Sequence, residues 1–381
     1  MSNAMTSRER VLTALNHAEP DRVPLVLWGS YYTLNDETYF YLLKHLRLGE
    51  PLPPFRRYMS RNSNFYDDRV LDRLDTDVRY VWSGFTDLGG ARMEVDGRDA
   101  WGVQWERYGP NVSGVGFPLA GATLEHVADF DWPELADYFD VDLMKSRLAM
   151  LKRDYPTHAI GARAVNSYGP FEQAADLRSR VEFFMDTITN PDIAQLIVDK
   201  VTDVIVRGQE IYLDIVGKDI DFFEIPGDDY GANQALMISP DTFRNLFKPA
   251  LAKIVQSVKA YRADLPVVFH SDGAITDIIP DLIEIGVDVL NPLEPLPVTD
   301  WQAIKTTYGD QLAFMGGIDI RTALPGSVED VMDEVKRRIE IFAPGGGYLL
   351  TSTNHMQIDI PPENVVAMYD AARKFGRYPI E

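Results

Sequence analysis

The sequence predicts an α/β fold, a (β/α)8 TIM barrel with a β-hairpin insertion after the second strand. Short apolar runs typical of buried parallel strands alternate with amphipathic segments at helical spacing, and we count eight such runs. Polar residues follow these runs, and parallel α/β folds bind ligands at that edge. The alternative is an open, doubly wound sheet, but the chain has no glycine-rich dinucleotide-binding loop to support it.

Composition narrows the class of protein and its partners. The 381 residues are 45% hydrophobic and 25% charged, as in ordinary globular proteins. A formal net charge of -21 argues against nucleic acid and against an anionic membrane surface as partners. There is no cysteine, which excludes disulfides and zinc–thiolate sites and permits a reducing cytoplasm, where we expect the protein.

The chain shows no apolar run of about 18 residues and no signal peptide. Residues 1–4 resemble an expression-vector scar before a native start at Met5. We therefore expect a single barrel domain over residues 5–381, with the insertion at about 91–121.

The N-terminal part supplies the first two strands and the insertion. A short helix over 6–16 precedes an apolar strand at 24–28, and a second helix over 36–48 precedes the strand at 77–82. The region 92–121 fits neither a helix nor a barrel strand. Its Asp96-Gly97 pair and its aromatic residues predict a β-hairpin.

The middle of the chain continues the alternation. We expect, in order, a helix at 143–154, a strand at 158–165, helices at 172–189 and 191–217, and a strand at 222–225. The next helix has a clear start, because Ser239 can cap it and Pro240 suits its first position. Pro249 should bend that helix.

The C-terminal part supplies the remaining four strands, expected at 266–269, 287–290, 312–315 and 348–350. Gly286 closes the helix between the first two of them. A helix starts after Ser327, with Asp330 three residues on, and the last helix starts near Pro361.

Polar residues at the strand ends should converge on the mouth of the barrel. They are Asn166, Asp228, Asp229, His270, Asp272, Asn291, Glu294, Asp319, Asn354 and His355. The most specific candidate is His270-Ser271-Asp272, which directly follows a strand. The alternative is a tight turn that caps the next helix, with His270 a core residue whose hydrogen bonds are satisfied.

His355 follows the eighth strand, so it should lie on the same rim as His270. Two imidazoles with carboxylates from Asp272, Asp228 or Glu294 would form a nitrogen and oxygen site for zinc or a similar divalent metal. A hydrogen-bonded set without a metal is the alternative, because the spacing is not a metal signature in itself.

Several stretches resemble the uroporphyrinogen decarboxylase superfamily, which includes cobalamin-dependent methyltransferases. The matching stretches are residues 9–25, 99–105, 227–255, 267–295, 314–331 and 346–376. The resemblance implies a (β/α)8 barrel, in agreement with the strand count.

The resemblance also separates two branches. The true decarboxylases carry an arginine-rich R-Q-A-G-R-Y pattern after the first strand, whereas residues 28–32 here read WGSYY without arginine. The methyltransferase branch holds zinc with a His-x-Cys pair and a later cysteine. Here His270 matches the histidine, Asp272 takes the position of the first cysteine, and Asn354 or His355 falls near the second.

On this resemblance we expect metal-dependent methyl transfer from a small methylated substrate to a corrinoid on a partner protein. The expected metal ligands are His270, Asp272 and His355. The expected catalytic residues are Asp272, Asp228 and Glu294, and the expected substrate-binding residues are Tyr31, Asn166, Asn291 and Asp319. The alternatives are decarboxylation of uroporphyrinogen or another acid, and corrinoid or tetrapyrrole binding without catalysis. A homodimer is the expected assembly if the chain is not a monomer.

Overall fold

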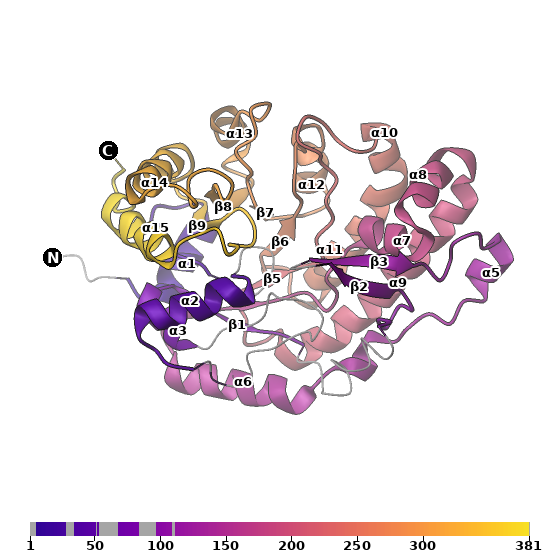
Figure 1. The fold of residues 1–381 in the computed structure, drawn as a ribbon, viewed down its shortest axis with the longest axis horizontal. Helices are drawn as coiled ribbons and strands as arrows, with labels where there is room; N and C mark the ends of the chain where they lie inside the picture. Colours follow the sequence, from indigo (N-terminus) through magenta and orange to yellow (C-terminus); the bar gives the residue numbers. More distant parts are fainter. Residues whose placement is uncertain are drawn as a thin grey trace.

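The computed structural model describes residues 5–27, 34–50, 52, 68–83, 97–108 and 111–380. Residues 1–4, Trp28 at the end of the first predicted strand, and Tyr31 lie outside these ranges. The described residues confirm the (β/α)8 barrel. In Figure 1 the parallel strands gather near the centre of the molecule and helices surround them.

Seven parallel strands form one curled sheet in the order β1-β4-β5-β6-β7-β8-β9. The strands are β1 (Val78–Val81), β4 (Ala159–Ala162), β5 (Phe222–Glu224), β6 (Val267–His270), β7 (Val289–Asn291), β8 (Ala313–Ile318) and β9 (Tyr348–Ser352). Every residue of these strands is buried, because helices cover the outside and side chains fill the inside.

Residues 24–27 close the barrel between β9 and β1. Leu25 bridges Leu350 of β9 in parallel, and the Leu350 amide donates to the Pro24 carbonyl at 2.9 Å. On the other side, the Asp77 amide donates to the Leu25 carbonyl at 2.8 Å. The Leu25 amide bonds the Asp77 carboxylate instead of a backbone carbonyl, at 2.8 Å. A side chain thus replaces part of the ladder here, and the described residues 24–27 form an isolated bridge instead of a regular strand.

The helices expected from the sequence are present with one exception, and three further helices, at 68–74, 124–128 and 301–308, were not expected. They are α1 (Ser7–Leu15), α2 (Asp36–Leu46), α3 (Asp68–Leu74), α5 (Leu124–Ala128), α6 (Val141–Asp154), α7 (Pro170–Arg178), α8 (Arg180–Thr189), α9 (Pro191–Val216), α10 (Pro240–Thr242), α11 (Lys248–Tyr261), α12 (Ile279–Glu284), α13 (Trp301–Tyr308), α14 (Val328–Phe342) and α15 (Pro362–Phe375). Short helical turns complete the set: η1 (Leu135–Tyr138), η2 (Phe243–Phe247) and η3 (Thr276–Ile278). None of the helices in the described part of the chain is long and apolar enough to cross a membrane.

The exception is the single helix predicted at 172–189. It is two helices, because Ser179 adopts a φ of 71° and ends α7. The Ser179 hydroxyl then accepts from the Glu182 amide and caps α8. Near Pro249, which was expected to bend the helix, the π-helical turn η2 precedes α11, and Pro249 lies in the first turn of α11.

The predicted hairpin is confirmed as the antiparallel pair β2 (Gln104–Tyr108) and β3 (Asn111–Gly116). It is tied to the barrel by Trp101, which is buried and donates its indole N–H to the Asn166 side chain at 3.2 Å. The insertion therefore reaches the carboxyl end of β4.

Helix α1 covers the amino ends of the strands. Its residues Val11, Ala14 and Leu15 pack in one cluster with interior side chains such as Val268 and Val289. The Gly347 amide, just before β9, donates to the Ala14 carbonyl at 3.1 Å. With the amino end covered, the carboxyl ends of the strands are the place for a site.

Candidate active site

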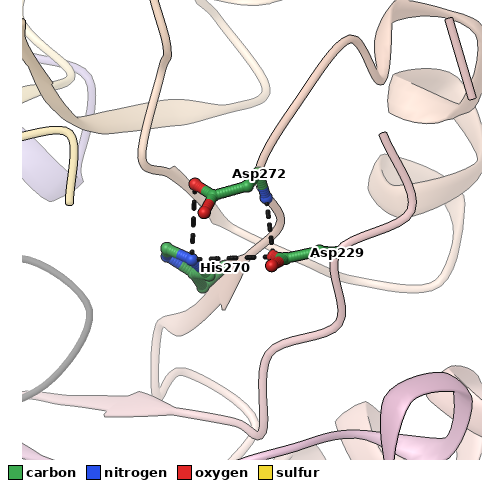
Figure 2. A group of neighbouring side chains, drawn as sticks. All are labelled: Asp229, His270 and Asp272. Atoms are coloured by element: carbon green, nitrogen blue, oxygen red, sulfur yellow. Dashed lines mark hydrogen bonds and ion pairs between the residues drawn. The ribbon is translucent and has the colours of Figure 1, made fainter. Parts of the chain in front are cut away.

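Three side chains meet at the carboxyl ends of β5 and β6: Asp229, His270 and Asp272 (Figure 2). The His270 Nε2 atom lies 3.6 Å from the Asp272 Oδ1 atom and 3.8 Å from the Asp229 Oδ1 atom. Within the described residues these three can offer ligand atoms that all lie within 4.8 Å of one another.

The two loops that carry these residues touch through their backbones. His270 ends β6, and its carbonyl accepts from the Asp228 amide at 3.1 Å. The Asp272 amide donates to the Asp229 carboxylate at 2.9 Å. A Cβ on Gly273 would lie 2.3 Å from the backbone of Gly231, so only glycine fits at this contact. The sequences GDDYG and HSDG are therefore two halves of one packed unit.

Asn291 of β7 fixes the orientation of the His270 ring through a hydrogen bond. The Asn291 Nδ2 group donates to the Met315 carbonyl at 2.9 Å, so its Oδ1 atom faces His270. That oxygen bonds the His270 Nδ1 atom, which must therefore carry the proton. The Nε2 atom is left to face the two carboxylates. Asn291, expected to bind substrate, is fully buried with both ends of its amide engaged.

Asp272 is held from the opposite side of the barrel. Its Oδ2 atom accepts from the Asn354 side chain, which follows β9, at 2.7 Å. Its Oδ1 atom is buried and accepts no hydrogen bond from the described residues. His355 follows β9 on the same rim as His270, as expected, but the structure brings Asn354 to Asp272 and leaves His355 outside the group of three.

The electrostatics of the group favour a protonated His270 in the metal-free protein. Burial lowers the pKa of His270, but the carboxylates of Asp272 and Asp229 and the bond to Asn291 outweigh it and raise this pKa to about 9. Burial and the charge of Asp272 raise the pKa of Asp229.

Asp228 points away from this group, toward the first turn of α7. It is fully buried and accepts from the amides of Phe171 at 3.0 Å and Glu172 at 2.9 Å, and from the Tyr230 hydroxyl at 3.0 Å. Burial raises the pKa of Asp228 to about 7 against these hydrogen bonds. Asp228, expected to be catalytic, thus holds the start of α7.

Glu172 is a site residue that the sequence analysis did not single out. It is buried, and burial together with the charges of Asp229 and Asp228 raises its pKa well above the ordinary value. Arg180 donates to it at 3.2 Å. The available signal was Pro170, which marks a helix start directly at the barrel mouth and so places an acid of the first turn there.

Glu294 connects the loops that follow β6, β7 and β8. It accepts from the Gly273 amide at 2.6 Å and from Arg321 at 3.0 Å. Burial and the charge of Asp272 raise its pKa. Its position beside Asp272 agrees with the expected place at the mouth.

The other expected substrate residues make internal contacts. Asn166 donates to the Tyr168 carbonyl at 2.7 Å and to the Gln173 side chain at 3.0 Å. Asp319 accepts from the Arg321 amide at 2.9 Å and from the Thr322 hydroxyl. Tyr31 lies outside the described residues.

Comparison with known proteins places this architecture in a family. The sequence model of the uroporphyrinogen decarboxylase (URO-D) family matches residues 147–375, more than half of the chain. The chain belongs to the URO-D family.

Individual relatives are distant. The chain is 24% identical to a uroporphyrinogen decarboxylase of Salinibacter ruber over 194 residues, which are 50% of this chain and 49% of that protein. It is 27% identical to one of Hordeum vulgare over 143 residues, which are 36% of this chain and 40% of that protein. The chain thus spans about half or less of the length of the curated relatives it matches.

A solved structure matches nearly end to end. A methyltransferase from Methanosarcina mazei aligns over 97% of this chain and 99% of its own, with a TM-score of 0.67 and 21% identity. At that identity the likeness shows a shared fold.

In this URO-D family member the site fits a divalent metal. One imidazole nitrogen and two carboxylate oxygens are the donor types that zinc accepts, and catalytic zinc sites keep three protein ligands and one open position. Tetrahedral ligands at about 2.1 Å from an ion lie roughly 3.4 Å apart, close to the distances seen around Nε2. The Asp272 Oδ1 atom without a hydrogen bond and the Asn291 bond to Nδ1 both agree with this assignment.

Proposed function

We propose that this protein is a methyltransferase that moves a methyl group from a small methylated substrate to a corrinoid on a partner protein. The observation that carries the proposal is the convergence of His270, Asp272 and Asp229, whose possible ligand atoms all lie within 4.8 Å of one another. The name of the Methanosarcina mazei protein of the same fold supports it.

The residues divide the work as follows. A zinc or similar ion held by Asp229, His270 and Asp272 would supply a Lewis acid for the heteroatom that bears the methyl group. Asn291 keeps the His270 Nε2 atom toward the ligand, and Asn354 keeps Asp272 turned to the same point. Glu294, whose pKa is raised, provides the proton that the heteroatom takes up when its bond to the methyl carbon breaks.

Decarboxylation of uroporphyrinogen or another acid is the second candidate, because both relatives found by sequence are uroporphyrinogen decarboxylases. Two features weigh against a polycarboxylate substrate. Residues 28–32 contain no arginine, and Glu172, Asp229, Asp272 and Glu294 place several carboxyl groups around the mouth. Carboxyl groups, protonated or not, supply none of the positive charge that would hold such a substrate.

The test uses zinc-loaded protein, free cob(I)alamin as the acceptor, and separate methoxylated, methylaminated and methylthiolated donors. We expect methylcobalamin to form with one donor class, seen by its absorbance spectrum, and to be lost in His270→Ala. Stepwise decarboxylation of uroporphyrinogen at an enzymatic rate would replace the proposal with the second candidate. Cobalamin binding without either reaction would show a binding protein.

A further inference from the structure

We propose that a cavity at the amino ends of β4, β5 and β6 binds a small organic anion with an apolar body. The cavity measures about 620 Å³ and lies between α1 and the ends of α6, α9 and α11. Pockets that bind small molecules commonly measure about 300–1,000 Å³.

This cavity is separate from the candidate active site. Pro266, which lines it, directly precedes β6, whereas His270 is the last residue of the same strand. The cavity and the metal group therefore lie at opposite ends of the barrel, and helix α1 covers the end where the cavity lies (Figure 1).

The charges around the cavity favour an anion. Its cationic side chains are Arg8, Lys152, Lys218 and Arg262, and its acidic ones are Asp219, Asp221 and Asp264. Each acid already has a cationic partner: Arg8 lies 2.9 Å from Asp221, Lys152 lies 2.6 Å from Asp219, and Arg262 lies 3.6 Å from Asp264.

The remaining cation is Lys218, which has no hydrogen-bond or ion-pair partner among the described residues. In a chain with a net charge of -21, a cavity with one cation in excess is a place where an anion meets little repulsion.

Helix dipoles explain only part of this arrangement. Cations are common at helix C-termini, and Lys152 in the last turn of α6 follows that rule. Arg8 lies in the first turn of α1, where the dipole disfavours a cation. Its ion pair with Asp221 accounts for its position there.

The walls of the cavity are held in place by the protein itself. Arg262 donates to the Gly217 carbonyl at 2.9 Å and to the Ile220 carbonyl at 2.8 Å. The Asp221 carboxylate accepts from the Ile160 amide at 2.9 Å. The site is thus largely formed before a ligand arrives, which lowers the entropic cost of binding.

The other walls define the body of the ligand. Leu12 and Leu15 of α1 line the cavity together with Ile160 and Ile220, so an apolar group has a surface to pack on. His158 adds a polar contact without charge, because burial and the charge of Arg79 lower its pKa. The fitting ligand is one carboxylate, sulfonate or phosphate on an apolar skeleton.

The experiment uses two fluorescent probes of similar shape on the full chain. 1-Anilinonaphthalene-8-sulfonate carries the anion, and N-phenyl-1-naphthylamine lacks it. We expect the sulfonate to bind with one-to-one stoichiometry and at least about tenfold more tightly than the amine, because only the sulfonate engages Lys218.

Four variants test where the sulfonate binds. Lys218→Glu should weaken sulfonate binding about tenfold, and Lys218→Arg should keep it within about twofold. Lys145→Glu, which makes the same charge change at an exposed position of α6 outside the cavity, should have less than about a twofold effect. Leu12→Trp should weaken both probes by filling the space.

Three results would overturn the proposal: no sulfonate binding, equal affinity for the two probes, or equal effects of Lys218→Glu and Lys145→Glu. Lys218 is exposed, so its substitution should leave the thermal melting curve unchanged, and that curve checks folding.

Discussion

Buried carboxylates at the two ends of the barrel differ in how fully their oxygen atoms are hydrogen-bonded. At the amino end, the fully buried Asp77 accepts from Arg10 at 2.5 Å, from Arg22 at 2.7 Å and from the Leu25 amide at 2.8 Å. At the carboxyl end, Asp272 keeps one buried oxygen without a hydrogen bond, and acids outnumber cations around it.

This difference separates stability from function. A carboxylate with every oxygen engaged holds chain segments together, whereas one with an open oxygen costs stability and retains the capacity to bind a ligand. The variants below test that contrast, beginning with the largest expected effect.

Removing Asp77 should cost the most stability. Asp77→Ala leaves Arg10 and Arg22 without their shared partner and breaks the bond that closes the barrel at Leu25, so we expect a loss of about 3–5 kcal/mol. Urea unfolding measures it. The matched control is Asp75→Asn, at an exposed acid 3.6 Å from Arg22 whose φ of 54° asparagine tolerates, which should cost less than about 1 kcal/mol. Equal losses of unfolding free energy in the two variants would show that the ion pairs of Asp77 do not stabilise the closure of the barrel.

Removing His270 should remove most of the metal binding. We expect His270→Ala to lower zinc affinity by more than about 100-fold, measured by titration against a chelating indicator. His355→Ala distinguishes the ligand set expected from the sequence from the set that the structure brings together. Full zinc affinity in this variant supports Asp229 as the third ligand, whereas a loss equal to that of His270→Ala supports His355.

Substitution of Asn291 should lower zinc affinity less than substitution of His270, because Asn291 only orients the His270 ring. Asn291→Leu removes the acceptor for the His270 Nδ1–H group without touching a ligand, so we expect zinc affinity to fall about 10- to 100-fold. Nitrogen NMR of the His270 ring should then show mixed tautomers at high pH, instead of the Nδ1–H form alone. An unchanged tautomer in Asn291→Leu would contradict this role.

The pH dependence of the metal-free protein should show the smallest effect. The pKa of His270 rises from about 6.5 unfolded to about 9 folded, so its contribution is fully present below pH 6.5 and is lost as the pH rises to 9. The pKa of Asp228, about 7 when folded, confines its own effect to pH values below that window. Lys305, whose pKa burial lowers to about 8, titrates in the same window with the opposite sign, so the two effects are separated by comparison with a variant. The stability advantage of the wild type over His270→Gln, measured by unfolding in chelator, should shrink by on the order of 2 kcal/mol between pH 7 and 9.

The fold was largely readable from the sequence because its signals are local. Alternating apolar runs mark the strands, and caps such as Ser239 and Ser327 mark helix starts. The break at Ser179 was not readable, because a non-glycine residue with positive φ carries no sequence signal.

The sequence predicts where the site lies, but it predicts less well which neighbouring loop residues belong to it. His270 and Asp272 lie at the predicted mouth, since a strand end fixes where they are. The choice between Asp228 and Asp229, or between Asn354 and His355, depends on which way a loop residue points. Loops lack the strict alternation of strands, so neighbouring residues cannot be assigned to opposite directions from sequence alone.

The glycine contact between the loops after β5 and β6 bears on ionic selectivity. Gly231 and Gly273 meet backbone to backbone, so no side chain between them can yield to let Asp229 and Asp272 move apart. Calcium needs six to eight oxygen ligands at about 2.3–2.6 Å in a flexible shell, and a span set by main-chain atoms cannot widen to provide it. The contact should therefore make the site discriminate by ionic radius, favouring small divalent ions of low coordination number over calcium.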